Sequence, residues 1–218
     1  MNKIIPTVFV EKGDNFDERF SLVTSLTEEI HIDIMDGSFV PKSSIGINSL
    51  PDLQDYPDHV FEVHLMVTNP GQYLENLSKM GFKRVIFHYE SVGTDLDVKY
   101  LAALVRRHKM EPMVAISPDT PAESLFLIDT ISKVLVMGVY PGKENQQFIT
   151  NTYKKVSQLK ERGFFVQVDG GVTPAVAKHL AKIGCDKANS GSFVSNASNP
   201  ESALEELEDA WQEGLHES

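Results

Sequence analysis

Two short apolar segments of the chain carry ionisable side chains where a buried strand would have aliphatic ones. The first reads His31-Ile-Asp33-Ile-Met35, and the second reads Val-His64-Leu-Met66-Val. Because side chains alternate between the two faces of a strand, His31, Asp33 and Met35 share one face, as do His64 and Met66. Burying such groups is costly unless they pair or bind a metal, so both segments indicate a polar site inside the fold.

A second carboxylate, Asp169, ends a third apolar segment just before two glycines. With His31, Asp33 and His64 it makes a set of two imidazoles and two carboxylates. This donor set suits one divalent ion, Zn²⁺, Fe²⁺, Mn²⁺ or Co²⁺, and does not choose among them. Simpler interpretations exist for single residues, namely a buried His–Asp hydrogen bond and a tight turn at Asp169. The four residues together favour a metal site.

Glycines follow the last two apolar segments, at Gly170-Gly171 and at Gly191-Ser192. Without a side chain in the way, backbone N–H groups can approach an anion closely. We therefore expect these two turns to bind a phosphate group. Gly142 and Lys143, in the loop after an earlier apolar segment, are expected to close over the same group.

Eight β-branched apolar segments alternate with helical patterns along the chain. The expected strands are Ile4–Phe9, Ile30–Met35, Val60–Val67, Arg84–His88, Pro112–Ile116, Val134–Val139, Phe164–Asp169 and Lys187–Ser190. The expected helices are Phe16–Leu26, Gly71–Met80, Asp95–Lys109, Ala122–Ile131, Asn151–Arg162, Pro174–Lys182 and Ala203–Gly214, with Ser49–Leu53 left open between loop and short helix. Strict alternation implies parallel strands with right-handed crossovers.

The number of units decides between two α/β architectures. An open doubly wound sheet usually has about five or six strands. Eight units instead favour a (β/α)8 TIM barrel, built as a single domain over residues 1–218. Active sites of such barrels lie at the C-terminal rim, and the last two loops often bind phosphate there. The barrel would therefore bring the metal ligands and the glycine turns together.

Composition narrows the class of protein. The chain has 218 residues, with 31 acidic against 20 basic side chains and a formal net charge of -11. Such an acidic protein is a poor candidate for nucleic-acid or anionic-membrane binding. We expect neither a signal peptide nor a transmembrane helix. The single cysteine, Cys185, excludes an intrachain disulfide and favours a reducing, cytoplasmic setting.

The sequence resembles the ribulose-phosphate 3-epimerase family over nearly its whole length. The motifs that carry the resemblance occur in the family's order. They are His31-Ile-Asp-Ile-Met-Asp-Gly-Ser-Phe-Val-Pro41, His64-Leu-Met-Val67, His88-Tyr-Glu90, Ser117-Pro-Asp-Thr-Pro121, Met137-Gly-Val-Tyr-Pro-Gly142, Val168-Asp-Gly-Gly171 and Ser190-Gly-Ser192.

This resemblance implies an isomerase of carbohydrate metabolism that inverts C3 of a ketose phosphate. The first candidate reaction interconverts D-ribulose 5-phosphate and D-xylulose 5-phosphate, as in the pentose phosphate pathway. By resemblance, His31, Asp33, His64 and Asp169 bind one divalent metal, and Asp33 and Asp169 transfer protons through a metal-stabilised enediolate. The substrate-binding residues are expected to be Thr7, Met35, Met66, Met137, Gly142, Lys143, Gly170, Gly171, Gly191 and Ser192. A homo-oligomer is implied as well.

The chain also departs from the family pattern. Thr7 and Ser117 replace a serine and an asparagine, and Asn189 is atypical of an apolar strand end. The loop Gly142-Lys-Glu-Asn-Gln146 lacks two glycines, and Glu144 within it would repel an anion unless it points away. The altered loop leaves one alternative open, an epimerase of another ketose phosphate such as allulose 6-phosphate. A second alternative is a catalytically silent phosphate-binding barrel, against which the retention of all four candidate ligands argues.

Overall fold

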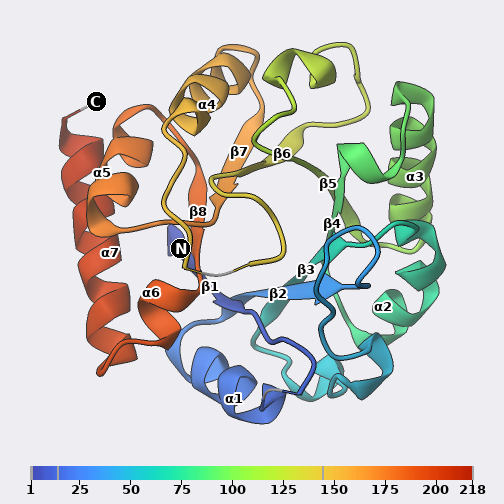
Figure 1. Ribbon diagram of the computed structural model, residues 1–218, viewed down its shortest axis with the longest axis horizontal. Coiled ribbons are helices and arrows are strands. Elements are labelled where there is room, and N and C mark those ends of the chain that lie inside the picture. The colour runs from blue at the N-terminus through green and yellow to red at the C-terminus, as the bar shows by residue number, and fades with distance from the viewer. Residues whose placement is uncertain (1, 14, 144, 218) are drawn as a thin grey trace.

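Eight parallel strands close into a barrel in the computed structural model, which describes residues 2–13, 15–143 and 145–217 (Figure 1). Each strand pairs with the next one in the sequence, and the last pairs with the first. The strands are β1 (Ile4–Val8), β2 (Glu29–Met35), β3 (Val60–Met66), β4 (Arg84–His88), β5 (Glu111–Ile116), β6 (Lys133–Met137), β7 (Phe165–Asp169) and β8 (Lys187–Ser190). The expected TIM barrel is confirmed.

Helices surround the strands (Figure 1). They are α1 (Phe16–Leu26), α2 (Leu74–Met80), α3 (Asp95–Arg107), α4 (Asn151–Glu161), α5 (Pro174–Lys182), α6 (Ser192–Ser195) and α7 (Pro200–His216). Side-chain caps mark several of their starts: Thr94 accepts from the backbone N–H of Asp97, and Thr173 from that of Val176. Within the described part of the chain, no helix is both long and apolar enough to span a membrane.

Strand alternation separates two environments in the barrel. On β2, Ile32 and Ile34 belong to the large apolar core between the strands and the helices. On β6, Leu135 and Met137 belong instead to a separate small cluster with residues of β4 and β5. His31 and Asp33, which alternate with the two isoleucines, therefore point into the barrel as the sequence predicted.

One expected helix is absent from the described chain. The segment Ala122–Ile131 forms a 3-10 helix over Ala122–Leu125 followed by further turns. Its buried residues Leu125, Ile128 and Ile131 recur every third position, and the backbone N–H of each of the last two bonds to the carbonyl three residues before. A repeat of three suits 3-10 geometry rather than an α-helix. Near Ser49–Leu53 the structure likewise has short 3-10 helices, at Ile47–Ser49 and Leu53–Asp55.

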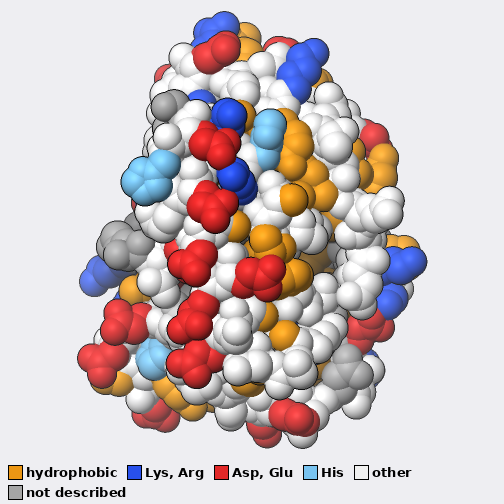
Figure 2. Space-filling view, turned by 90° about the vertical axis from the view of Figure 1, so that its left-hand side faces the viewer, with side chains coloured by type: hydrophobic (Ala, Val, Ile, Leu, Met, Phe, Trp, Pro, Cys, Tyr) orange, Lys and Arg blue, Asp and Glu red, His pale blue; other side chains and the backbone are white. Residues whose placement is uncertain are grey.

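The last helix forms hydrogen bonds with the N-terminal segment of the chain. Glu208 of α7 accepts hydrogen bonds from the backbone N–H groups of Lys3 and Ile4, each at 2.8 Å. Trp211 of the same helix is fully buried. Acidic side chains gather on the surface of this side of the molecule (Figure 2). On this surface Glu213 of α7 pairs with Lys178 of α5. The helix is thus amphipathic, with its apolar side packed inward.

The single thiol is buried between β7 and β8. Cys185 is 4% exposed, and its Sγ lies 3.3 Å from the carbonyl oxygen of Val166 and 3.2 Å from that of Lys187. Burial raises the pKa of the thiol to about 12. Cys185 is therefore an inert core residue at neutral pH.

Candidate active site

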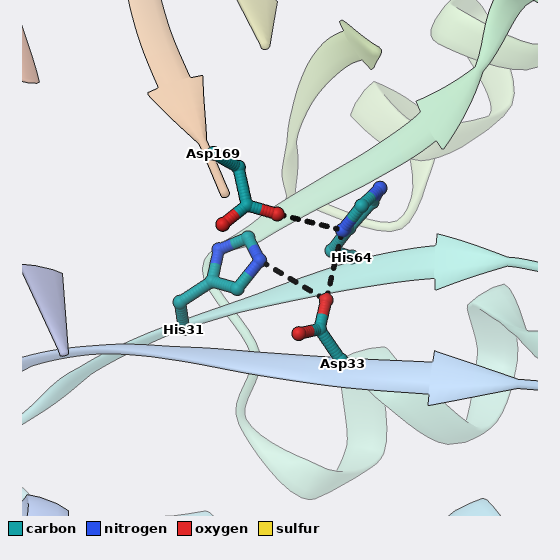
Figure 3. Close-up of side chains that lie close together, drawn as sticks. All are labelled: His31, Asp33, His64 and Asp169. Carbon is teal, nitrogen blue, oxygen red and sulfur yellow. Dashed lines mark hydrogen bonds and ion pairs between the residues drawn. The ribbon is translucent and has the colours of Figure 1, made fainter. Parts of the chain in front are cut away.

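The side chains of His31, Asp33, His64 and Asp169 meet at the C-terminal end of the barrel (Figure 3). All four residues are buried, and each offers a ligand atom within 4.8 Å of the others. Pairing of β2 with β3 sets Asp33 beside His64, while Asp169 is the last residue of β7. Nδ1 of His64 lies 2.8 Å from Oδ1 of Asp33 and 3.7 Å from Oδ2 of Asp169. The structure assembles the cluster that the sequence predicted.

The donor set of this cluster is compatible with a metal ion. Nε2 of His31 is buried and has no hydrogen-bond partner among the described residues. It lies 3.3 Å from Oδ1 of Asp33, so this nitrogen faces the same space as the carboxylates. Two imidazole nitrogens and two carboxylates around one point match the ligand types and number of a divalent site.

The pKa values of the two carboxylates are shifted in opposite directions. Burial raises the pKa of Asp33, but close contacts with His31 and His64, and the positive charge that these rings can carry, outweigh burial and hold it well below its usual range. For Asp169, burial and the negative charge of Asp33 raise the pKa above its usual range. A pair of carboxylates whose pKa values are driven apart is typical of an acid and a base that work together.

The first histidine of the cluster also favours its charged form. Burial lowers the pKa of His31, yet the carboxylates of Asp33 and Glu62 beside the ring raise it well above its usual value. The surrounding acids thus stabilise positive charge at this point, whether it comes from a proton or from a metal ion.

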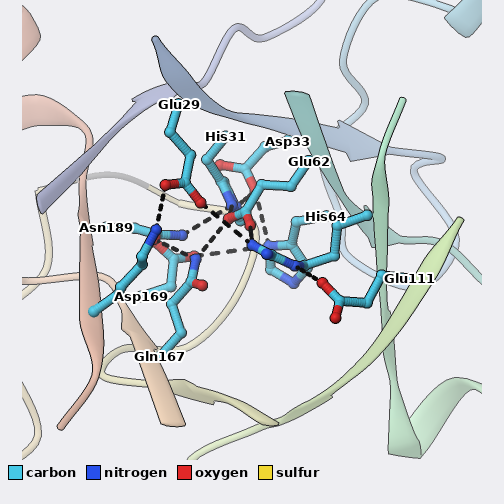
Figure 4. A network of polar contacts seen from close by, with 11 residues as sticks. Glu29, His31, Asp33, Glu62, His64, Glu111, Gln167, Asp169 and Asn189 are labelled. Carbon is cyan, nitrogen blue, oxygen red and sulfur yellow. Dashed lines mark hydrogen bonds and ion pairs between the residues drawn. The ribbon is translucent and has the colours of Figure 1, made fainter. Parts of the chain in front are cut away.

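A buried polar network contacts His31 through its Nδ1 atom (Figure 4). Its Nδ1 lies 2.6 Å from Oε1 of Glu62, a residue that is 1% exposed. Gln167 donates to Glu62 at 2.5 Å and to Asn189 at 2.7 Å. Burial raises the pKa of Glu62, but its bond to His31 and the charges of His31 and Arg84 bring it down to about 2.

Sequence reasoning missed most of this network. Only Asn189 stood out, as a polar residue at an apolar strand end. The signal for the others was the same strand alternation that singled out the candidate ligands: Glu62 precedes His64 by two positions, and Gln167 precedes Asp169 by two. Their partners, however, depend on strand pairing around the barrel.

A second chain of contacts supports His64. Its Nε2 lies 2.9 Å from Nε2 of His88, and Nδ1 of His88 lies 2.9 Å from Oε2 of Glu90. Glu90 also accepts from the backbone N–H of Ser117, at 2.8 Å, and from the hydroxyl of Thr120. The motif His88-Tyr-Glu90 therefore joins the cluster to the loop after β5.

A pocket opens beside the four clustered side chains. Asp33 and Asp169 line it, and so do Phe9 and Val139, two residues that sequence reasoning had assigned to apolar strand ends. Of the ten expected substrate-binding residues, nine line this pocket: Thr7, Met66, Met137, Gly142, Lys143, Gly170, Gly171, Gly191 and Ser192. Met35 does not; it is 3% exposed and packs with Phe9, Val40 and Met66 instead.

Two hydroxyl groups at this end of the barrel lack partners. Oγ1 of Thr7 and Oγ of Ser190 are buried and make no hydrogen bond with any described residue. Leaving a buried hydroxyl unpaired costs free energy, so such groups are commonly reserved for a ligand or water. Because Thr7 lines the pocket, its hydroxyl is available to a bound molecule there.

The glycine turn after β7 requires glycine. Gly170 and Gly171 have positive φ values of 96° and 71°. A Cβ on Gly170 would lie 2.3 Å from Cγ2 of Val139, and one on Gly171 would lie 3.0 Å from the backbone of Phe148. Glycine is therefore required at both positions, and both residues line the pocket, which suits an anion bound by backbone N–H groups.

The loop after β6 lies over the pocket against the loop after β2. Gly142 has a φ of 88°, and a Cβ on it would lie 2.7 Å from Cβ of Val40. The hydroxyl of Tyr140 donates to Asp119 at 2.9 Å, and Lys143 lines the pocket. Glu144, the residue expected to repel an anion, lies outside the described residues.

Comparisons of the sequence with known proteins identify relatives of this chain. Residues 4–195 match the model of the ribulose-phosphate 3 epimerase family. The chain is 34% identical over 184 residues to the cytoplasmic isoform of ribulose-phosphate 3-epimerase from Oryza sativa subsp. japonica, covering 82% of this chain and 80% of that protein. It is 32% identical over 196 residues to ribulose-phosphate 3-epimerase from Methanocaldococcus jannaschii, covering 85% and 80%.

Solved structures share the barrel at low sequence identity. KGPDC from Streptococcus mutans superposes with a TM-score of 0.72 at 17% identity, covering 97% of this chain and 98% of that one. A 3-hexulose-6-phosphate synthase superposes with a TM-score of 0.71 at 15% identity, covering 96% of this chain and 99% of that one. At these identities the likeness concerns the fold alone.

Proposed function

Because the chain belongs to the ribulose-phosphate 3-epimerase family, we propose that it is a metal-dependent 3-epimerase that interconverts D-ribulose 5-phosphate and D-xylulose 5-phosphate. The observation that carries the proposal is the pair Asp33 and Asp169. They reach one pocket from β2 and β7, two strands that β1 and β8 separate in the ring, and their pKa values are shifted in opposite directions.

Epimerisation at C3 needs one group that removes a proton and another that returns a proton to the opposite face. C3 is next to the ketone, so loss of its proton gives an enediolate. Asp33 and Asp169 are the two groups that exchange a proton with C3, and the opposite shifts of their pKa values suit Asp33 to the role of base and Asp169 to that of acid. In the reverse direction the two residues exchange roles. A divalent ion bound by His31, Asp33, His64 and Asp169 would supply Lewis-acid stabilisation of charge on the substrate oxygens.

Other residues of the pocket would orient the substrate and protect the carbanion. The N–H groups of Gly170, Gly171 and Gly191 would bind the phosphate, with the charge of Lys143 nearby. Thr7 would pair its free hydroxyl with a substrate oxygen. Met66 and Met137 line the pocket without an acidic proton, so they do not compete with the aspartates for the reacting carbon.

A related substrate is the second candidate. The loop Tyr140–Gln146 differs from the family pattern, and here it is held by Tyr140 on Asp119 and by Gln146, which donates to the carbonyl oxygens of Tyr140 and Lys143. A loop altered at the phosphate end of the pocket favours an epimerase of another ketose phosphate, such as allulose 6-phosphate.

Three further expectations belong to this proposal. Residues 1–218 would act as one domain, the enzyme would assemble into a homo-oligomer, and it would work in the cytoplasm on a small sugar phosphate. Light scattering at micromolar concentration tests the assembly, and a monomeric mass would contradict it.

Kinetics with both substrates test the function. The protein is assayed with D-ribulose 5-phosphate and with D-allulose 6-phosphate, and proton exchange at C3 is followed in D₂O with and without a chelator. We expect kcat/KM for the pentose phosphate to exceed that for the hexose phosphate by at least about tenfold. The reverse order would favour the second candidate. Absence of exchange with either substrate, after a divalent metal is added, would contradict both.

A further inference from the structure

Glu62 occupies the position next to His31 in the barrel interior. β2 and β3 pair in a register that sets His31 beside Glu62, two residues before the pair Asp33 and His64. We propose that Glu62 is a positioning residue, which holds His31 in the tautomer with its proton on Nδ1 and turns the lone pair of Nε2 toward the metal site. The inference rests on the proposed function, since that function assigns His31 to a metal ion.

The contacts of Glu62 identify it as a hydrogen-bond acceptor. Its Oε1 accepts from Gln167 at 2.5 Å, and its Oε2 pairs with the guanidinium of Arg84. Both oxygens therefore already face donors, which suits an ionised carboxylate. Nδ1 of His31 lies 2.6 Å from Oε1. At that distance from an ionised oxygen the nitrogen must carry the proton.

Asn189 opposes this tautomer. Its Oδ1 accepts from Gln167 at 2.7 Å, which fixes the amide so that Nδ2 lies 2.9 Å from Nδ1 of His31. An amide N–H can donate to Nδ1 only if Nδ1 carries no proton. Glu62 and Asn189 thus favour opposite tautomers of His31. The charged acceptor forms the stronger hydrogen bond, so Glu62 prevails while it is present.

Glu62 belongs to a balanced set of charged side chains, part of which is drawn in Figure 4. Arg84 pairs with Glu62, with Glu111 at 2.9 Å and with Glu29 at 3.5 Å. Glu29 also pairs with Lys187, and Glu111 with Lys133 at 2.7 Å. Three acids and three bases make this set neutral. Glu29 shares Arg84 with Glu62, but its ion pairs run to Arg84 and Lys187 rather than to His31, which makes it a matched control.

The test measures metal affinity and the tautomer separately. Dissociation constants for Zn²⁺ are obtained by competition with a chelating dye for the wild-type protein and for the Glu62→Gln, Glu29→Gln and Asn189→Ala variants. Nuclear magnetic resonance of the Zn²⁺-loaded protein, with ¹⁵N-labelled histidine, reports which ring nitrogen of His31 carries the proton.

We expect Glu62→Gln to weaken Zn²⁺ binding by about 10- to 100-fold, the usual effect of losing a carboxylate that orients a histidine ligand. Glu29→Gln should weaken it by less than about threefold, and Asn189→Ala should leave it unchanged or tighten it, because the opposing donor is gone. In the wild-type protein the proton of His31 should be on Nδ1.

Three results would overturn the inference. One is a folded Glu62→Gln variant that binds Zn²⁺ as well as Glu29→Gln does. Another is a loss of about tenfold or more on Asn189→Ala, which would make Asn189 the positioning residue. The third is a wild-type His31 protonated on Nε2, a result that needs no variant to fold. A wild-type protein that binds no divalent ion would contradict the metal centre of the proposed function instead, so the two failures are distinguishable.

Discussion

His64 and His88 face each other through their Nε2 atoms at 2.9 Å, inside the barrel and away from solvent. Burial lowers the pKa of His88, so at neutral pH its ring is uncharged and carries one proton. Nδ1 of His88 lies 2.9 Å from the carboxylate of Glu90 and donates to it. His88 must therefore accept at Nε2, and His64 must donate from its own Nε2. Nδ1 of His64 then faces Asp33 and Asp169.

The contact between the two histidines predicts that His88 supports metal affinity. Replacing His88 by Phe fills the site but leaves the Nε2 proton of His64 without an acceptor. We expect Zn²⁺ to bind about tenfold more weakly, by analogy with other partners of histidine ligands. The dissociation constant from dye competition checks this, with His59→Phe as the control because His59 lies outside the cluster. Equal affinities in the two variants would contradict the prediction.

Loss of either aspartate should remove proton transfer on one face of the substrate. Asp33→Asn and Asp169→Asn should each lower turnover by at least about 100-fold. Proton exchange at C3 is measured in D₂O, starting from each epimer in turn. Each variant should lose exchange from one epimer far more than from the other, and the more affected epimer should differ between the two variants. Metal content has to be measured in both variants, since both residues are candidate ligands. A fully loaded variant with near-normal epimerisation would show that another group moves the proton.

Gly142 should be essential for the loop that covers the pocket. A Cβ there would lie 2.7 Å from Cβ of Val40, and its φ is 88°. Strain at such a position is about 1–3 kcal/mol, so Gly142→Ala should raise KM by roughly tenfold or more. Val40→Ala in the same chain should not restore the wild-type KM, because the backbone strain remains. Gly46→Ala is the control, since Gly46 has a φ of -69° and no atom near the added carbon. Equal KM values for the two alanine variants would refute the prediction.

Glu90 should make the fold sensitive to acid. Burial raises its pKa, but the bond to His88, the charge of that ring and the bond to Thr120 bring the pKa from 4.5 down to about 2. A depressed carboxyl pKa stabilises the folded state above the unfolded value, and this stability is lost as the pH falls from about 4.5 to about 2. Glu90→Gln should therefore lose less stability than the wild type over that range.

Urea unfolding followed by the fluorescence of Trp211, the single tryptophan and fully buried, measures this difference. The free energy of unfolding is compared at pH values above and below the interval. If the free energy of unfolding falls by the same amount in both proteins as the pH is lowered, Glu90 is not a source of the acid sensitivity.

Much of the fold and of the cluster of His31, Asp33, His64 and Asp169 could be predicted because both follow from local alternation. His31, Asp33 and His64 interrupt strands whose other faces are aliphatic, and their spacing alone puts them inside the barrel. Glu62 shares a face with His64 in the same way, but its meaning depends on Gln167 and on Arg84, which lie on other strands. Such contacts follow from register around the ring, which no short segment specifies.

The pocket shows a second limit of sequence reasoning. Met35 has the same spacing from Asp33 that Met66 has from His64, yet it packs against Val40 and does not line the pocket. The loop after β2 covers it, and loop conformation does not follow from strand alternation. The same holds for Ala122–Ile131, where tertiary packing selects 3-10 turns over the α-helix that the composition allowed.

The buried position of Cys185 gives the protein an internal reporter of its own opening. Because this single thiol is buried against β7 and β8 and is protonated at neutral pH, a thiol reagent reaches it only when the packing around it opens. The rate of its labelling under native conditions therefore measures how often the packing beside the strand that ends at Asp169 opens. Substrate or metal that binds at the rim should slow this labelling, so the labelling rate of Cys185 reports whether the site is occupied.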